Sequence, residues 1–510
     1  MTNETITSFL NRPELKIVES ACKGEWGSAA IIDQFIPEHS SVHSKILSLH
    51  VPPLSPTLGQ CDSEASISTV HPWRPKENQV VATSTEHSGP VNRLAVSEDQ
   101  TFFVSASFDG TSKVFELRQA HDSGGDIQSC LTYEGHQCEN EISPVRINDV
   151  SILEHSHSVA TAASDGSLHV WRVDLEAKNS RVSTHRLLRN INHPDEGEVL
   201  AVSHLKTPTG SILAYATQRG NVHTSDIRSA HEPFCLNLKP ELGYLTAFEV
   251  GADSNWIVAG TSRGFIGLWD VRFQTMVKLW RHNRDSPIKC LTNSFDDNSL
   301  SRPLLFTGCN NNEAALFDVS TGGCLQCYRV LDSSLSYVDQ SVLPPNCLSM
   351  PYLESVNIPS HSKDRLVSFD SALQKSRHVD SQTSMNALVG YINLRGTGSY
   401  LMTGGSDHMI RCWDLQSASR SCYISGLERS QPPPSFEQIQ VGSAARLILC
   451  RQPTAPPTSL VESSKLPLQN RQGVVKCNGG HSDSILDLCV VKDPALLLSA
   501  SRDNTIKLWA

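Results

Sequence analysis

The clearest pattern of apolar and polar positions lies at the C-terminal end of the chain. An apolar run over Leu496–Ser501 is followed by a polar turn, 502–504, and then by alternating polar and apolar residues from Thr505 to Trp509. A short apolar run bounded by turn residues indicates a buried strand, and alternation indicates a strand with two different faces. The stretch therefore predicts two antiparallel strands joined by a tight turn, preceded by a Gly-His pair and closed by a tryptophan.

The spacing of this unit recurs along the chain, with steps of four and six residues between a small residue, a turn residue and an aromatic residue. Four copies are strong: Ser105, Asp109, Phe115; Thr161, Asp165, Trp171; Thr403, Asp407, Trp413; and Ser499, Asp503, Trp509. Three keep mainly the frame: Tyr215, Arg219, Ser225; Ala259, Arg263, Trp269; and Thr307, Asn311, Phe317. The units resemble WD repeats, and seven of them predict an all-β fold, a seven-bladed WD-repeat β-propeller.

The last unit ends at Trp509-Ala510, which leaves no residues for an outermost strand. Residues 79–84 (Gln-Val-Val-Ala-Thr-Ser) directly precede the first unit, where such a strand belongs. We therefore expect this segment to complete the seventh blade and close the ring, since an open edge would expose unpaired backbone groups. The period of two places Val80 and Ala82 on one side and Val81 and Thr83 on the other.

The domain organisation follows from these boundaries. Residues 1–78 are expected to form a mostly irregular extension, and residues 79–510 the propeller. Turn position 407 lies 96 residues after turn position 311, and turn position 503 lies 96 residues after 407. Two blades therefore carry long inserts, at about 331–384 and about 427–476. Both inserts are rich in proline and poor in strand periodicity, which favours surface loops. The alternative is that they are arms that dock partners on one side of the propeller.

The polar residues of the units predict a hydrogen-bonded network inside each blade. The turn Asp can accept from a loop His, the His can bond the Ser or Thr of the strand, and that hydroxyl can accept from the Trp indole. Partly buried polar groups need such partners. The predicted network residues are His87, Ser105, Asp109, His136, Thr161, Asp165, Trp171, Thr403, Asp407, Trp413, His481, Ser499, Asp503 and Trp509.

Ser499, His481 and Asp503 also have the residue types of a hydrolytic triad. A triad is needed once, whereas this constellation repeats, and the chain has no G-x-S-x-G elbow. We therefore expect no catalytic residue, no cofactor and no metal ligand. Cys324 and Cys327 form a C-x-x-C without a second pair at zinc spacing, so strand residues are favoured over a metal or redox site.

Composition narrows the partners and the compartment. The net charge of −10 argues against sequence-independent binding of nucleic acid, which needs a basic face. The 15 cysteines lack the spacing of a small secreted framework and are expected to be core residues in a reducing compartment. The N-terminus has no signal peptide pattern, and no run reaches the roughly 18 apolar residues of a membrane span. These features predict a cytoplasmic protein, or one held on a membrane through a partner.

The amino-acid sequence of the repeats also resembles that of a known family. Pro72-Trp73-Arg74-Pro75, the blade turn 107–110 (Ser-Phe-Asp-Gly) and the closing stretch 500–509 resemble the C-terminal propeller of the phosphoinositide 3-kinase regulatory subunit 4 family. The resemblance covers about residues 72–510. Full-length members carry a protein-kinase-like domain and a helical solenoid before the propeller. This chain has no Gly-rich phosphate loop, V-A-I-K, H-R-D or D-F-G motif, so the resemblance implies no kinase activity for it.

What the resemblance implies is a non-catalytic scaffold of the class III phosphatidylinositol 3-kinase complex, in autophagy and in endosomal or vacuolar sorting. Its implied partners are the lipid-kinase catalytic subunit and coiled-coil autophagy or endosomal subunits. Nucleic acid is not an expected partner, and membrane contact on endosomes and autophagic membranes is expected only through the complex. The alternative is an unrelated WD-repeat adaptor, such as a substrate receptor of a ubiquitin ligase, and co-purification separates the two.

Overall fold

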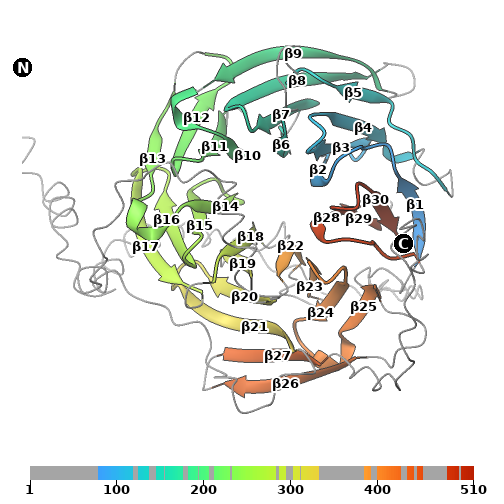
Figure 1. Cartoon of the computed structure of the whole chain (residues 1–510). Helices are drawn as coiled ribbons and strands as arrows, with labels where there is room; N and C mark the ends of the chain where they lie inside the picture. The colour runs from blue at the N-terminus through green and yellow to red at the C-terminus, as the bar shows by residue number, and fades with distance from the viewer. Residues whose placement is uncertain are drawn as a thin grey trace, which may run out of the picture. The chain divides into compact units, whose positions relative to one another are not determined.

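Seven sheets make up the part of the chain that a computed structural model describes, and each contacts the next through its innermost strand (Figure 1). Their neighbouring strands are antiparallel apart from one parallel pair in blade 5. The described residues are 79–510 without 119–124, 137–144, 154–155, 176–181, 193, 206–211, 230–231, 283–285, 294–302, 311, 332–383, 392–398, 427–433, 442–444, 452–478 and 493–494. The prediction of a seven-bladed WD-repeat propeller is confirmed. The predicted extension, 1–78, and the predicted loop at about 331–384 fall outside the described residues, apart from the ends of the loop.

The blades follow one another in chain order, and the first three strands of each run from the innermost outward. Blade 1 contains β2 (Val91–Val96), β3 (Phe102–Ser107), β4 (Ser112–Glu116) and β5 (Leu131–Tyr133); blade 2 contains β6 (Ile147–Ile152), β7 (Ser158–Ala163), β8 (Ser167–Leu175) and β9 (Val182–Asn192). Blade 3 contains β10 (Val199–Leu205), β11 (Ile212–Thr217), β12 (Asn221–Asp226) and β13 (Cys235–Asn237); blade 4 contains β14 (Leu245–Val250), β15 (Trp256–Thr261), β16 (Phe265–Asp270) and β17 (Thr275–Arg281).

The remaining blades complete the ring. Blade 5 contains β18 (Ile288–Asn293), β19 (Leu304–Cys309), β20 (Glu313–Asp318) and β21 (Gly323–Leu331), together with β27 (Ala445–Arg451) and β26 (Ser435–Val441). Blade 6 contains β22 (Met385–Tyr391), β23 (Tyr400–Gly405), β24 (Ile410–Asp414) and β25 (Cys422–Ser425). Blade 7 contains β28 (Ile485–Lys492), β29 (Ala495–Ser501), β30 (Ile506–Trp509) and β1 (Val80–Ser84).

The core lies between the faces of neighbouring blades. The second strand of a blade packs on both faces, and β3 (FFVSAS), β7 (SVATAA) and β23 (YLMTGG) are buried along their whole length. Their small residues let the sheets approach each other: a Cβ on Gly404 would lie 2.5 Å from a methyl group of Ile485 in the next blade. Cys327 and Cys324 pack in different clusters of this core, as expected for strand residues.

Two backbone devices repeat in all seven blades. The first strand has a register shift beside its second residue, such as that between Val91 and Arg93, which indicates a β-bulge at the inner edge of each blade. The turn between the second and third strands has one residue with positive φ. It is glycine in four blades (Gly110, Gly166, Gly220, Gly264) and Asn312, His408 or Asn504 in the others. Glycine, and to a lesser degree asparagine, adopt this conformation at low cost.

The predicted closure of the ring is confirmed. β1 pairs antiparallel with β30, with Val80 opposite Trp509 and Ser84 opposite Ile506. The prediction that Val80 and Ala82 share a face is wrong, because a bulge lies between them. Val80 packs in the cluster that contains Trp509, whereas Ala82 packs with Phe103 in the cluster between blades 7 and 1.

The insert at about 427–476 is not wholly irregular, which corrects the sequence-based prediction. Its residues form the hairpin β26–β27, and β27 adds in parallel to β21, with Gln326 opposite Arg446. Phe436 of the hairpin packs edge-on against Trp413 of blade 6, at 5.5 Å between ring centroids. The hairpin therefore widens blade 5 to six strands and braces it against blade 6 (Figure 1).

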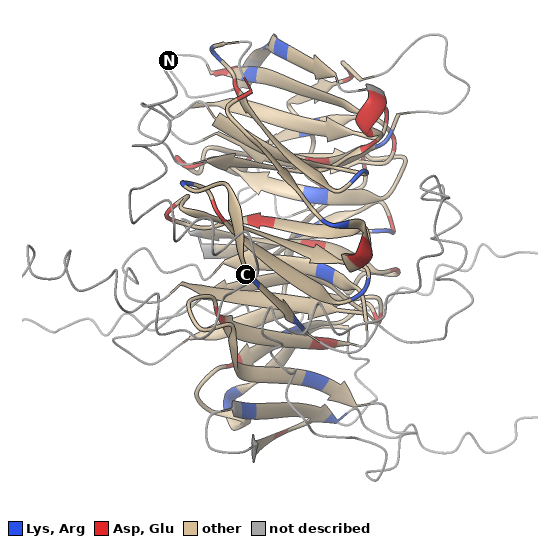
Figure 2. Ribbon diagram, turned by 90° about the vertical axis from the view of Figure 1, so that its left-hand side faces the viewer, with Lys and Arg blue, Asp and Glu red and all other residues tan. Residues whose placement is uncertain are grey.

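In the view of Figure 2, Lys and Arg positions and Asp and Glu positions are interspersed along the strands and turns. No helix among the described residues is long and apolar enough to cross a membrane.

Candidate functional site

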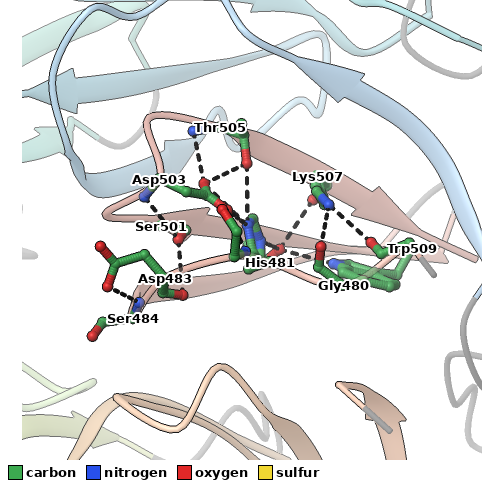
Figure 3. Close-up of polar contacts among 12 residues, drawn as sticks. Gly480, His481, Asp483, Ser484, Ser501, Asp503, Thr505, Lys507 and Trp509 are labelled. Atoms are coloured by element: carbon green, nitrogen blue, oxygen red, sulfur yellow. Dashed lines mark hydrogen bonds and ion pairs between the residues drawn. The ribbon is translucent and has the colours of Figure 1, made fainter. Parts of the chain in front are cut away.

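The polar network of blade 7 joins the loop before β28 to the turn and strand that end the chain (Figure 3). Asp503 is an acceptor, so His481 donates to it from Nδ1, at 3.1 Å from Oδ2. Nε2 of His481 then accepts from the Ser499 hydroxyl at 2.7 Å, and Ser499 Oγ in turn accepts from the Trp509 indole at 2.8 Å. The backbone N–H of Ser482 also donates to Asp503, at 2.8 Å. Five residues from the loop, β29, the turn and β30 are thus fixed together.

This connectivity is that of a Ser-His-Asp triad, but its surroundings are structural. Ser499 is 0% exposed, and its oxygen already accepts from the Trp509 indole. A nucleophile must be reachable by a substrate atom, with donors placed to receive the developing oxyanion. Ser499 is buried and fails the first condition, so we interpret the network as a brace of the blade.

The electrostatics of the turn carboxylate support this role. Burial alone would raise the pKa of Asp503, but hydrogen bonds from His481, Thr505 and the Ser482 backbone hold the pKa well below its usual range. The carboxylate therefore stays ionised across the physiological range. Lys507, four residues after Asp503, donates to the carbonyls of Gly479 and Gly480 at 2.9 and 2.6 Å and ties the same loop to the strand.

Blade 1 repeats the arrangement without the tryptophan. His87 lies 2.8 Å from Asp109 through Nδ1 and 2.7 Å from the Ser105 hydroxyl through Nε2. Burial raises the pKa of Asp109, but hydrogen bonds from His87 and Thr111 outweigh it and keep the pKa well below its usual range. Phe115 occupies the tryptophan position and stacks on Phe103 at 4.8 Å.

In blade 2 the loop histidine is linked to the turn aspartate through a serine. Nε2 of His136 accepts from Thr161 at 2.9 Å, but Nδ1 bonds Ser167 at 2.8 Å, and Ser167 donates to Asp165 at 2.6 Å. Asp165 is therefore linked to the histidine through a serine rather than directly as the spacing predicts. The Trp171 indole N–H has no hydrogen-bond partner among the described residues, and the ring stacks on Tyr133 at 4.5 Å instead.

Blade 6 has an arginine where the other strong blades have a histidine. Arg411, only 1% exposed, pairs with Asp407 at 2.5 Å, and its guanidinium lies 5.0 Å from the centre of the Tyr423 ring. Burial lowers the pKa of Arg411, but Asp407 and the other neighbours raise it above its usual range overall. The Trp413 indole donates to Thr403 at 2.9 Å, as in blade 7.

The three weaker copies lack this network. In blade 3, Tyr215 stacks on His223, and Arg219 is exposed. In blade 4, Arg263 donates to the carbonyl of Glu241 at 2.8 Å. In blade 5, Thr307 is buried, whereas Asn311 falls outside the described residues. The frame of the repeat persists in these blades although its polar residues differ.

Charged residues also join neighbouring blades near the inner edge of the ring. Asp149 of blade 2 accepts from the backbone N–H of Val202 in blade 3, and Asp487 of blade 7 accepts from that of Leu94 in blade 1, both at 2.8 Å. Arg93 lies between the two carboxylates, 3.5 Å from Asp149 and 3.3 Å from Asp487. Arg93, Asp149 and Asp487 thus form a clasp that joins blades 7, 1, 2 and 3. The clasp includes the contact between blades 7 and 1, where the ring closes.

Comparison with known proteins shows what the chain is similar to. Residues 78–116, 127–172, 383–414 and 473–510 match the family "WD domain, G-beta repeat". The chain is 29% identical over 453 residues to the serine/threonine-protein kinase VPS15 of Arabidopsis thaliana, covering 86% of this chain and 29% of that protein. It is 24% identical over 484 residues to the putative serine/threonine-protein kinase VPS15 of Komagataella pastoris, covering 90% of this chain and 32% of that protein.

The chain is a WD-repeat propeller related to the VPS15 proteins. A third relative, the probable serine/threonine-protein kinase vps15 of Dictyostelium discoideum, is 36% identical over 205 residues, which are 39% of this chain and 10% of that protein. VPS15 is another name for phosphoinositide 3-kinase regulatory subunit 4, so the resemblance recognised from the sequence is confirmed.

The chain spans about a third or less of the length of these VPS15 relatives. The described residues form a WD propeller and contain no protein-kinase domain. The four segments that match the repeat family contain the second strand and all or most of the third strand of blades 1, 2, 6 and 7, the blades with the strong copies of the repeat.

Sequence reasoning missed two features of the VPS15-like propeller. Arg411 replaces the loop histidine of blade 6, and the available signal was a cation four residues after a turn aspartate, the position of Lys507 in blade 7. The clasp of Arg93, Asp149 and Asp487 was also missed. Its signal was a charged residue at the third position of three first strands, immediately after the bulge.

Proposed function

We propose that this chain is the non-catalytic scaffold region of a class III phosphatidylinositol 3-kinase complex that acts in autophagy and in endosomal or vacuolar sorting. The observation that carries the proposal is the alignment with VPS15 proteins over 86–90% of the chain. Its partners would be the lipid-kinase catalytic subunit and the coiled-coil subunits. The chain would be cytoplasmic and would reach endosomal and autophagic membranes through the complex.

The geometry supports a scaffold in two ways. The blades are fixed to each other by buried clusters and by the clasp around Arg93, so the ring can present partners at constant positions. The serine that could have been a nucleophile is buried and already bonded. A rigid ring with its polar network turned inward suits assembly rather than chemistry.

A tagged copy of the full chain, expressed in cells and purified by its tag, tests the proposal. We expect the class III lipid-kinase subunit and coiled-coil subunits to co-purify in stoichiometric amounts. A variant without residues 1–85 lacks the strand that closes the ring and should recover much less of both. A seven-bladed WD protein of unrelated function is the control for non-specific capture.

The outcome separates the scaffold from the adaptor. Recovery of cullin-type ligase subunits without the lipid kinase would replace the proposal by the adaptor interpretation. Absence of both from a chain that still melts cooperatively would reject the scaffold role. Fluorescence microscopy adds a second test, since puncta on endosomal membranes should disperse when the lipid-kinase subunit is depleted.

A further inference from the structure

Three side chains of the kinds that bind transition metals meet at the outer rim of blade 3. His223 of β12 and Cys235 of β13 are cross-strand partners in the ladder, and Glu232 lies three residues before Cys235. Nδ1 of His223 lies 2.5 Å from a carboxylate oxygen of Glu232. One ligand atom from each of the three residues lies within 4.8 Å of the other two. Among the described residues, this is the one group of three or more such side chains gathered so closely.

A fourth residue, Glu196, faces the histidine from the opposite side. Oε2 of Glu196, in the short 3-10 helix η1 (Pro194–Glu196), lies 3.5 Å from Nε2 of His223. Glu196 is itself fixed by the Thr217 hydroxyl at 2.9 Å and by the Asn221 amide at 2.8 and 3.1 Å. A carboxylate beside Nε2 favours a proton on that nitrogen, so Nδ1 can give up the proton that faces Glu232 and bind a cation instead. This pairing of a carboxylate with the far nitrogen of a histidine is typical of metal-ligating histidines.

We propose that His223, Glu232 and Cys235 bind a Zn²⁺ ion at the rim of blade 3, with Glu196 as the positioning residue. Nitrogen, thiolate and carboxylate ligands together favour zinc, whereas calcium and magnesium prefer oxygen alone. Zinc replaces the proton between Nδ1 and Glu232 and the proton of the Cys235 thiol, both of which leave to solvent. Because Cys235 is exposed, the fourth position is open to a water molecule.

The distances within the cluster allow zinc to bind after a small movement of the Glu232 side chain. Tetrahedral zinc with bonds of about 2.0–2.3 Å places its ligand atoms about 3.3–3.8 Å apart. The Glu232 oxygen must therefore withdraw by about 1 Å from Nδ1. The Glu232 side chain is 41% exposed and can move, whereas His223 is buried and held by β12.

The ion would give blade 3 a substitute for the network that it lacks. The outer strand β13 has three residues and pairs with β12 over Asn221–His223. A metal that bridges His223 to Cys235 and Glu232 joins these two strands by coordination bonds. Its binding free energy then contributes to the stability of the outer edge.

Cobalt substitution tests the site in the full chain, reduced and freed of metal. The matched variants are Cys235→Ser and Cys422→Ser, which each remove one exposed cysteine, from blade 3 and blade 6 respectively. We expect the wild-type chain and Cys422→Ser to bind one Co²⁺ with thiolate-to-metal charge-transfer absorption that Zn²⁺ displaces. We expect Cys235→Ser to lose this absorption. Its absence from the wild-type chain, its persistence in Cys235→Ser or its loss in Cys422→Ser would each overturn the proposal.

The variant Glu196→Gln tests whether Glu196 orients His223 without itself binding the metal. This variant should keep the charge-transfer absorption but bind Zn²⁺ about 10–100-fold more weakly, as expected for loss of an outer-shell partner. Added Zn²⁺ should also raise the melting temperature of Cys422→Ser and leave that of Cys235→Ser unchanged. Unchanged affinity in Glu196→Gln would remove its positioning role, and equal shifts in melting temperature would reject the site.

Discussion

Blades 7 and 3 share one backbone frame but satisfy their buried polar groups in different ways. Ser499 pairs with Lys507 across the central strands of blade 7, and Tyr215 pairs with His223 at the same place in blade 3. Both turns have a residue with positive φ, Asn504 or Gly220. In blade 7 a histidine and an aspartate link loop, turn and strand, whereas in blade 3 Glu196 contacts Thr217, Asn221 and His223.

The comparison separates what defines a blade from what stabilises it. The strand ladders, the buried second strand and the turn conformation are common to both blades and therefore set the frame. The hydrogen-bond network is one of several ways to pair polar groups that burial leaves without water. Substitution of a network residue should thus cost free energy in blade 7, while the equivalent position in blade 3 should tolerate it.

The largest effect is expected from opening the ring at blade 7. Deletion of residues 1–85 removes β1 and exposes the edge of β30, which invites association with other chains. Deletion of residues 1–70 removes no described residue and is the matched control. We expect aggregation or a large fall in melting temperature for the first deletion and little change for the second, measured by circular dichroism and sedimentation. Coincident melting curves for the two deletions would contradict closure by β1.

Blade 2 adds a pH dependence through its buried histidine, His136. Blade 7 adds one of the same sign, because burial also lowers the pKa of His481. His136 stacks on His169 at 3.8 Å, and burial, followed by the charge of His169, lowers the pKa of His136 to about 3. An unfolded histidine has a pKa of about 6.5, so the fold requires the neutral ring. The stabilisation is therefore complete above about pH 6.5 and is lost as the pH falls toward the folded pKa.

We expect wild-type stability to fall relative to His136→Gln between pH 7 and pH 4. The limiting slope is on the order of 1.4 kcal/mol per pH unit for one histidine. Urea unfolding at several pH values measures it. The other titratable groups facing the site are His169, whose pKa is also lowered by burial, Asp165, and Tyr133, whose pKa burial raises to about 12. A difference between the two proteins that does not change with pH would contradict the prediction.

Asp503→Ala tests the network of blade 7 directly. The substitution removes the acceptor of His481, of the Ser482 N–H and of Thr505. Leaving buried donors unsatisfied should lower the free energy of unfolding by about 1–3 kcal/mol with the fold preserved. Arg502→Ala, at the exposed neighbouring position, is the control and should stay within about 0.5 kcal/mol of wild type. Equal stability of the two variants would mean that the network contributes little.

Asp165→Ala should cost less than Asp503→Ala, because the histidine of blade 2 does not contact the aspartate. Asp165 accepts from the backbone N–H and the hydroxyl of Ser167, at 2.9 and 2.6 Å. Ser167 keeps its bond to His136 in the variant, and its hydroxyl proton can rotate to another acceptor. We expect a loss of about 1 kcal/mol, from the same unfolding measurement. A loss as large as that of Asp503→Ala would indicate that the two networks are equivalent after all.

The repeat frame was predictable because it depends on the spacing of residues that are close together in the sequence. Steps of four and six residues locate the strand and the turn of every blade and the aromatic residue of all but blade 3, which has Ser225 there. The missing outer strand after Trp509 predicts the closure by β1. The contacts inside the networks were less predictable. Spacing could not distinguish a direct histidine–aspartate bond from the route through Ser167, since both fit the same turn.

The hairpin β26–β27 was missed for a different physical reason. Phe436 and Ile439 of β26, and Leu447 and Leu449 of β27, give apolar positions, but they lie between proline-rich segments outside the repeat spacing. The partner strand β21 is more than a hundred residues earlier, and parallel pairing is not encoded by a local turn. The replacement of histidine by Arg411 in blade 6 likewise depends on Tyr423, which lies on the next strand.

The smallest effect is expected at the turn of blade 3. Arg219 occupies the position of Asp503, but its side chain is exposed, and Glu196 holds Thr217 and Asn221 on either side of the turn. Arg219→Ala should therefore change the free energy of unfolding by less than about 0.5 kcal/mol, as for other exposed positions. Glu196→Ala should cost more, because it removes the acceptor of the partly buried Asn221 amide and one of the two acceptors within reach of the Thr217 hydroxyl. Unfolding in urea measures both variants beside Asp503→Ala. If Arg219→Ala costs as much as Asp503→Ala, the turn position is equally important in both blades, and the distinction between frame and network fails.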